Sequence, residues 1–216
     1  MPRCVAVLAL VTLLFPAGPA HAQALGPSLS DVTEAYRALD GLQATFVQVM
    51  GSQFAGDSVR VEGSVLLAGT KYRVQTPRQT VVTDGATTWI YTPADSQVVV
   101  NNADTSAATI TPETFLTAST DRYTVEHTTP TTRLGTPHWI LDVTATAPAA
   151  RFQSVRLWVR RDDRIVTRMQ ATDRGGSTID LRLRNLTLNP ATLRSGTPFT
   201  FSPPDDVNVI DLRAGA

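Results

Sequence analysis

Residues 29–50, LSDVTEAYRALDGLQATFVQVM, contain the change of periodicity on which the fold depends. In the first part, apolar side chains recur three and four positions apart, at Leu29, Val32, Tyr36 and Leu39. Ser28 or Ser30 can cap this segment and Gly41 can end it, so the spacing predicts an amphipathic helix of about three turns. From Leu42 onward the period becomes two, which is typical of β-strands.

Beyond this point the chain alternates short strand-like runs with turn signals. Runs rich in Val, Ile, Thr and aromatic residues occupy 42–50, 59–68, 71–76, 80–83, 87–92, 97–101, 122–128, 137–145, 152–160, 164–173 and 177–188. Turn residues such as Asp84-Gly85 separate them, which favours antiparallel hairpins. Thr111-Pro112 followed by Phe115-Leu116 predicts a second short helix. We therefore expect a mainly β domain of about eleven strands with short helices on one face.

The N-terminal residues have the pattern of an export signal. Arg3 precedes the apolar run Cys4 to Phe15, and Ala20-His21-Ala22 offers a small-x-small cleavage site. This pattern predicts a signal peptide over residues 1–22 and a single soluble domain over 23–216. The run is too short to span a bilayer comfortably.

Composition excludes several classes of protein. With 42% apolar and 18% charged residues, the chain is not an intrinsically disordered polymer. Its 19 basic and 19 acidic residues include no basic block, so binding to nucleic acid or to an anionic membrane through bulk charge is not supported. The single cysteine, Cys4, lies in the predicted signal peptide, so the mature domain has no disulfide or thiolate metal site.

The sequence offers no catalytic constellation. The predicted mature chain contains only His127 and His138, and neither has a neighbour at metal-ligand spacing. A Gly-x-Ser-x-Gly elbow and a phosphate-binding Gly-x-x-x-x-Gly-Lys loop are both absent. We therefore expect no enzyme activity, no catalytic residue, no metal and no cofactor, and a secreted hydrolase is the poorest alternative.

Several short groupings follow one another in a fixed order. They are Ala44-Thr45-Phe46-Val47-Gln48, Gly63, Lys71-Tyr72-Arg73, Thr83-Asp84-Gly85, Trp89-Ile90-Tyr91, Gln97-Val98, Phe199-Thr200-Phe201-Ser202-Pro203-Pro204 and Val207-Asn208-Val209. Together with the signal peptide and the layout of a helix followed by strands, this order resembles the LolA-type periplasmic carriers of outer-membrane lipoproteins. The resemblance covers essentially the whole mature chain.

The resemblance implies both a fold and a function. The fold is an unclosed, or half, antiparallel β-barrel whose apolar concave face is covered by a helical lid. The function is that of a monomeric periplasmic chaperone. It binds the acyl chains of triacylated lipoproteins and moves these from an inner-membrane lipoprotein-releasing ABC transporter to an outer-membrane acceptor, LolB-like or other. The alternative is a periplasmic module of similar fold that senses a lipid or lipoprotein and carries no cargo.

Two positions depart from the family pattern. Family members often carry an Arg-Pro pair before the aromatic strand, and that arginine is thought to hold the lid; this chain has Ala68-Gly69-Thr70 there. The aromatic strand itself reads Tyr72-Arg73-Val74, with valine in place of a second large ring. We expect a different lid attachment and a different cavity shape.

Alternation along the strands and the resemblance together suggest which side chains line the lipid cavity. Because residues i and i+2 share a face, Tyr72 lies with Val74 and Trp89 with Tyr91. The complete candidate set is Phe46, Val65, Leu67, Tyr72, Val74, Trp89, Tyr91, Phe115, Leu116, Ile140, Leu157 and Val159. Each of these residues could instead be an ordinary part of the core.

Overall fold

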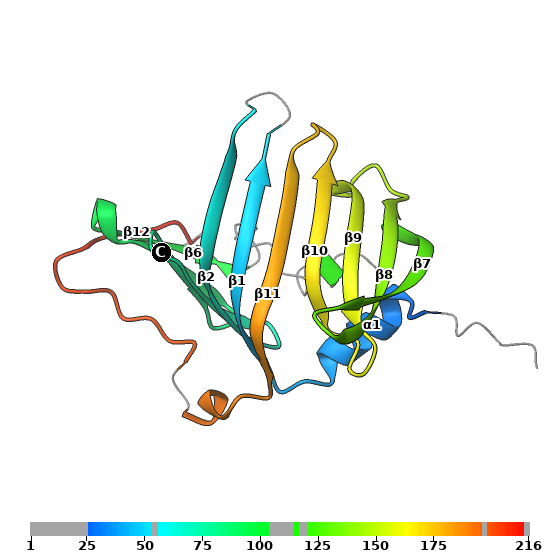
Figure 1. The fold of residues 1–216 in the computed structure, drawn as a ribbon. Coiled ribbons are helices and arrows are strands. Elements are labelled where there is room, and N and C mark those ends of the chain that lie inside the picture. The colour runs from blue at the N-terminus through cyan, green and yellow to red at the C-terminus, as the bar shows by residue number, and fades with distance from the viewer. Residues whose placement is uncertain (1–25, 53–55, 104–114, 117–120, 196–197, 214–216) are drawn as a thin grey trace, which may run out of the picture.

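The computed structural model describes residues 26–52, 56–103, 115–116, 121–195 and 198–213, and it is mostly β. Figure 1 shows one strongly curved sheet with helix α1 (Leu29–Arg37) beside it. Two short 3-10 helices, η1 (Pro93–Asp95) and η3 (Ala191–Ser195), lie elsewhere in the described chain. Within the described ranges, no helix has both the length and the apolar character needed to cross a membrane.

Helix α1 forms where the sequence predicts it and begins at a capping box. The amide of Asp31 donates to Ser28 Oγ over 3.1 Å, and the amide of Ser28 donates to Asp31 Oδ2 over 2.8 Å. These bonds satisfy amides that the first turn leaves without a helical partner. The face that α1 buries consists of Leu29, Val32, Thr33 and Tyr36.

Twelve strands form the sheet, in the order β12-β6-β5-β4-β3-β2-β1-β11-β10-β9-β8-β7. Their bounds are β1 Leu42–Gly51, β2 Ser58–Ala68, β3 Lys71–Gln75, β4 Thr80–Thr83, β5 Thr87–Thr92, β6 Gln97–Asn102, β7 Tyr123–Arg133, β8 Thr136–Ala145, β9 Phe152–Arg160, β10 Val166–Asp173, β11 Thr178–Leu188 and β12 Asn208–Asp211. All neighbours are antiparallel except β12, which pairs parallel with β6. The order begins and ends on edge strands, so the expected unclosed, mainly antiparallel sheet is confirmed.

Three local expectations differ from the structure or lie outside it. Strand β7 continues to Arg133 instead of ending at 128, because an edge strand tolerates Pro130, which lacks an amide hydrogen. The short strand β12 was not expected from the sequence, since it follows a double proline. The second predicted helix lies mainly outside the described residues, although Phe115 and Leu116 are buried.

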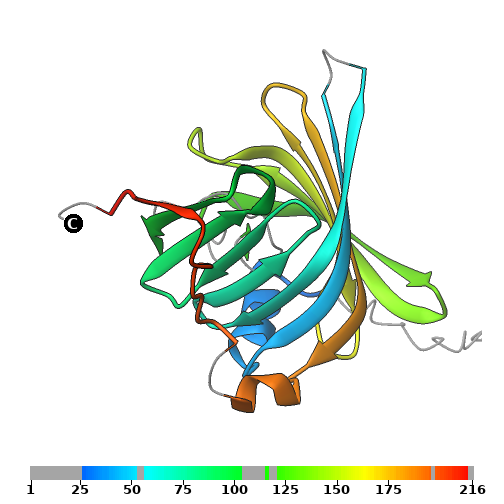
Figure 2. The same ribbon diagram turned by 90° about the vertical axis from the view of Figure 1, so that its left-hand side faces the viewer.

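The concave face of the sheet carries the main core. Every second residue of β1, β2, β3 and β8 to β11 points to this face and packs with the buried residues of α1. Figure 2 shows α1 lying within the curve of the sheet. Tyr36 fixes the helix, because its hydroxyl oxygen accepts a hydrogen bond from the amide of Val166 on β10 over 3.3 Å.

A second apolar layer lies on the convex face of β3 to β6. The C-terminal segment, residues 198–212, crosses this face and adds β12 to the edge of β6 (Figure 2). Arg73 on β3 ties it down, donating from Nε to the carbonyl of Pro198 and from Nη2 to that of Thr200, each over 2.7 Å. Val82, Val98 and Val100 on the sheet and Phe199 of the segment are buried.

Charged side chains stabilise the convex face farther along the sheet. Asp180 on β11 accepts hydrogen bonds from Arg168 at 2.7 and 2.9 Å and from Arg182 at 2.8 and 3.3 Å. Burial acts to raise the pKa of Asp180, but the hydrogen bonds and charges of the two arginines outweigh it and lower this pKa to about 2. Arg168 also stacks on Trp158, with its guanidinium carbon 4.4 Å from the ring centroid.

Replacing Asp180 with asparagine tests the charged network. We expect Asp180→Asn to lower the free energy of unfolding by about 1–2 kcal/mol at pH 7, because two arginines lose their counter-charge. The pKa of Asp180 is about 2 in the folded protein and is near 4 in an unfolded chain, so this stabilisation is complete above about pH 4 and is lost as the pH falls towards 2. Urea denaturation at pH 7 and pH 3 measures the difference in unfolding free energy between the variant and the original protein, which should shrink at pH 3.

Asp142→Asn is the matched control. The pair of Asp142 with Arg156 is more exposed, so this change should cost less than about 1 kcal/mol. A difference that does not change with pH would contradict this assignment.

Replacing Arg73 with glutamine tests the attachment of the C-terminal segment. The change removes two charged hydrogen bonds, so the segment should open more often while the sheet stays folded. Hydrogen exchange should accelerate at the amides of Asn208 and Leu212, which donate to Ser96 and Val100, and should not change within β1. Unaltered exchange at those two amides would mean that β12 pairing alone holds the segment.

Candidate functional site

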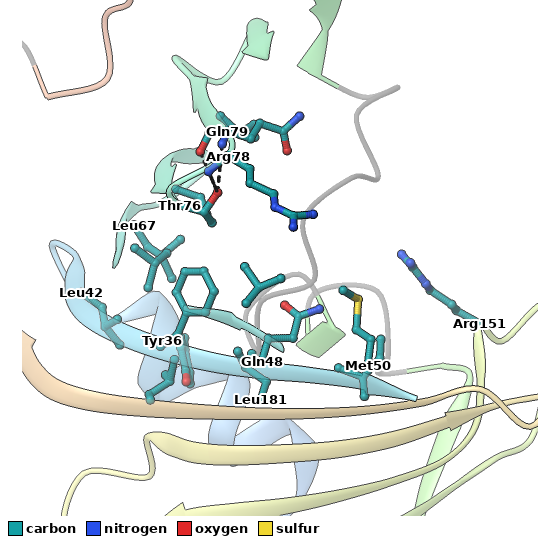
Figure 3. A pocket seen from close by; sticks show the side chains of 17 residues that line it. Tyr36, Leu42, Gln48, Met50, Leu67, Thr76, Arg78, Gln79, Arg151 and Leu181 are labelled. Carbon is teal, nitrogen blue, oxygen red and sulfur yellow. Dashed lines mark hydrogen bonds between the residues drawn. The ribbon is translucent and has the colours of Figure 1, made fainter. Parts of the chain in front are cut away.

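A cavity of about 400 Å³ opens on the concave side of the sheet, over the five adjacent strands β4, β3, β2, β1 and β11 (Figure 3). Apart from Gln48, its floor is apolar, and it comes from side chains on one face of each strand. These residues are Leu42, Phe46, Gln48 and Met50 on β1, Val61, Val65 and Leu67 on β2, Val74 on β3, Val81 on β4, and Ile179, Leu181 and Leu183 on β11. A volume of this size is typical of sites for small molecules.

Helix α1 forms one wall of the cavity through Tyr36. The hydrogen bond from the amide of Val166 on β10 to the Tyr36 hydroxyl holds the tyrosine ring in that wall. Ala68-Gly69-Thr70, where the resemblance leads us to expect an Arg-Pro pair, begins at the last residue of β2 and continues in the turn towards β3, and Gly69 adopts the left-handed φ of +57°. No charged side chain comes from these three residues, and the expected difference in lid attachment stays a prediction.

Gly63 on β2 makes room for the aromatic ring in the floor. Phe46 and Gly63 are directly opposite each other in the β1–β2 register. A Cβ atom at Gly63 would lie 2.8 Å from Cζ of Phe46 and 2.2 Å from the backbone oxygen of Gln75. The ring therefore occupies the space that a side chain would fill, and this close approach explains why glycine is required.

One part of the rim is polar. Thr76, Arg78 and Gln79 come from the turn between β3 and β4, and Arg151 comes from the residue before β9. Thr76 Oγ1 accepts from the amide of Gln79 over 3.0 Å and from that of Arg78 over 3.3 Å. These bonds fix the turn that presents the Arg78 side chain to the cavity.

The structure brings four of the expected site residues together in the cavity: Phe46, Val65, Leu67 and Val74. Tyr72 shares the concave face with Val74 and packs half-buried against the main core, outside the cavity. Whether any of these side chains contacts a lipid is still a prediction.

The other candidates lie elsewhere. Trp89 and Tyr91 do not line the cavity, because Ile90 between them is the register partner of cavity residue Val81 and strand neighbours point to opposite faces. Tyr91 instead contacts Phe201 of the C-terminal segment, with ring centroids 5.8 Å apart. Ile140 is also turned to the convex side, since its neighbour Leu141 is completely buried in the main core.

Phe115, Leu116, Leu157 and Val159 are part of the solid core and do not line the cavity. The ring of Phe115 meets that of Tyr123 edge-on, with centroids 5.1 Å apart, and lies 6.4 Å from that of Phe152. Leu157 and Val159 are completely buried on β9. These side chains fill the half of the concave face that the cavity does not occupy.

The sequence analysis did not predict most of the cavity residues, and two groups of them show why. Leu42, Gln48 and Met50 follow from the period of two around Phe46, and that signal could have found them. Ile179, Leu181 and Leu183 are placed there by the pairing of β1 with β11, which joins segments far apart in the chain. No local pattern marks that pairing, and none marks Arg78 or Arg151.

His138 has a structural role. It is 3% exposed, with Nδ1 2.8 Å from the carbonyl oxygen of Thr136 and Nε2 3.0 Å from Thr167 Oγ1. Both ring nitrogens are therefore satisfied by the β-sheet. Among the described residues, no cluster of three or more His, Cys, Asp or Glu side chains could hold a metal ion.

Substituting Gly63 tests the close packing of the floor. Gly63→Ala should lower the free energy of unfolding by about 1–3 kcal/mol, because the added methyl group displaces the Phe46 ring or the Gln75 backbone. Ala44→Gly, also on the concave face, is the control and should cost about 1 kcal/mol by loss of one methyl group and added chain entropy. Chemical denaturation measures both, and a neutral Gly63→Ala would show that the ring has free space to move into.

Comparisons with known proteins place this geometry in a family. The family described as "Outer membrane lipoprotein carrier protein LolA" matches residues 37–202, which include nearly all of the cavity lining. A search of curated proteins found no match.

Similar solved structures have low sequence identity. An uncharacterized conserved protein from Thermus thermophilus is 14% identical with a TM-score of 0.55, over 85% of this chain and 96% of that one. MucB is 17% identical with a TM-score of 0.50, over 84% of this chain and 63% of that one. A LolA superfamily protein from Nitrosomonas europaea is 14% identical with a TM-score of 0.43, over 82% and 99%. At these identities the likeness concerns the fold.

The family match covers well over half of the sequence, and the chain therefore belongs to the LolA family of outer membrane lipoprotein carrier proteins.

Proposed function

We propose that the protein is a periplasmic carrier that shelters lipoprotein acyl chains in the concave cavity and hands lipoproteins from the inner to the outer membrane. The observation that carries this proposal is the apolar cavity of about 400 Å³ within a fold of the lipoprotein-carrier family. Its partners would be triacylated lipoproteins, an inner-membrane ABC transporter and an outer-membrane acceptor. The carrier makes and breaks no covalent bond.

The energetics of acyl transfer suit such a cavity. Burying a chain of about 16 carbons is worth on the order of 12 kcal/mol against water, at about 0.8 kcal/mol per CH₂. This gain largely disappears when the chain comes from a bilayer, since one apolar medium replaces another. A carrier therefore needs to match the membrane closely, and a partly open cavity allows both uptake and release.

Binding of a triacylated lipopeptide tests the proposal directly. The purified protein should bind a fluorescent triacylated peptide saturably, at one site, and the same peptide without acyl chains should not bind. Saturable binding of neither peptide would refute the carrier function.

A pair of variants on β2 tests whether this cavity is the binding site. Val61 lines the cavity, and Val59, two residues earlier on the same face, is 53% exposed and lies outside it. Val61→Glu should weaken binding of the triacylated peptide by about tenfold or more, because a carboxylate in an apolar site is costly. Val59→Glu should change the affinity by less than about twofold, with circular dichroism confirming that both variants are folded. Equal effects of the two changes would locate the acyl chains elsewhere.

The second candidate function is sensing, in a module of similar fold that binds a lipid or lipoprotein signal without carrying it. The observation favouring it is the likeness of fold to MucB, a protein that has also been solved in complex with a partner protein, MucA. Depletion of the protein in its host separates the two: lipoproteins that accumulate in the inner membrane support a carrier. Normal lipoprotein distribution together with altered gene expression supports a sensor.

A further inference from the structure

Among the described residues that line the cavity, the charged side chains are all of one sign. Among the described residues that line it, two are arginines, Arg78 and Arg151, and none carries a carboxylate. Both side chains are exposed, and Figure 3 shows them reaching over the cavity from two separate parts of the fold, the β3–β4 turn and the residue before β9. The apolar floor lies below them. An apolar pocket with a cationic rim is complementary to a molecule with a hydrocarbon tail and an anionic head.

From this arrangement we propose that the cavity binds an amphiphile with an anionic head group, a carboxylate or a phosphate, which Arg78 and Arg151 hold at the rim while the acyl tail enters the apolar floor. The inference rests on the proposed function to the extent that the cavity takes acyl chains. It adds that the head group is selected by charge.

The two arginines are presented in ways that suit an anion. The β3–β4 turn is tied by Thr76, whose amide donates to the carbonyl of Gln79 over 2.9 Å and whose hydroxyl accepts from two amides of the turn. Arg78 therefore extends from a closed turn. The guanidinium carbon of Arg151 lies 5.5 Å from the ring centroid of Phe152, which is itself buried in the core. Each guanidinium can form two parallel hydrogen bonds to a carboxylate or phosphate.

The rim also distinguishes this ligand from the acylated end of a lipoprotein. In a triacylated cysteine, the acyl chains are joined through an amide and two esters, so that end has no negative charge. The acylated end of a lipoprotein therefore offers Arg78 and Arg151 no negative charge. A fatty acid or an acyl phospholipid would place its charge between the two arginines. An anionic amphiphile should therefore compete with a lipopeptide for the cavity.

Three single-chain probes with the same tail separate the head groups. Palmitate and 1-palmitoyl-lysophosphatidylglycerol carry the carboxylate and the phosphate, and 1-monopalmitoylglycerol is neutral. Displacement of a fluorescent acyl probe at pH 8, below the micelle concentration of each lipid, gives the three affinities. We expect the purified protein to prefer at least one anionic probe to the neutral one by about tenfold at low salt, and to lose much of that preference at about 0.5 M salt. The tighter anion identifies the source of the head group.

Arginine variants assign the preference to these side chains. Arg78→Gln and Arg151→Gln should each weaken binding of the preferred anionic probe by about three- to tenfold, and the double variant should bind all heads alike. Binding of 1-monopalmitoylglycerol should change by less than about twofold. Arg184→Gln is the matched control, since Arg184 is exposed on β11 and follows cavity residue Leu183, so it points to the opposite face.

Each outcome decides the inference. Loss of the anionic preference in the double variant, with neutral binding retained, supports it. Equal affinities for the anionic and neutral probes overturn the head-group assignment and leave the acyl cavity standing. If none of the probes and no triacylated peptide binds, both the head-group assignment and the proposed carrier function fail.

Discussion

The strongly curved antiparallel sheet has an apolar concave face, and the packing of the rest of the molecule depends on how that face is covered. Strand alternation gives the twelve-stranded sheet an apolar concave face, and the nine-residue helix α1 is too short to cover it. The helix, Phe115 and Leu116 fill one half as solid core, and the half over β1 to β4 and β11 is left as a cavity. Gly63 deepens that floor by admitting the ring of Phe46 where a side chain would otherwise lie.

The convex face is stabilised independently of the cavity. The Asp180 network links β10 to β11, and Arg73 holds the C-terminal segment over a separate apolar layer that contains Val82 and Val98. These interactions lie on the opposite side of the sheet, so they make no use of the side chains that line the cavity.

Much of this fold could be predicted from local pattern. The change of period at Leu42 located α1 and β1, and the turn residues located eleven of the twelve strands. One difficulty with the site was to tell which face of a strand each side chain lies on. Trp89 and Tyr91 are aromatic residues of β5, but they face the convex side, where Tyr91 contacts Phe201 of the C-terminal segment. The other difficulty was long-range pairing, since only the contact of β1 with β11 brings Leu181 to the cavity. Arg78 and Arg151 could not be predicted, because each belongs to a loop whose position depends on the finished sheet.

The central claim is that the concave cavity holds acyl chains, and native mass spectrometry of the protein purified from its host tests it most directly. The account predicts a bound mass that fragments to an acylated molecule, and that is reduced in protein carrying Val61→Glu but not Val59→Glu. Protein that carries no acylated molecule, and that acquires none when incubated with a triacylated lipopeptide, would contradict the account.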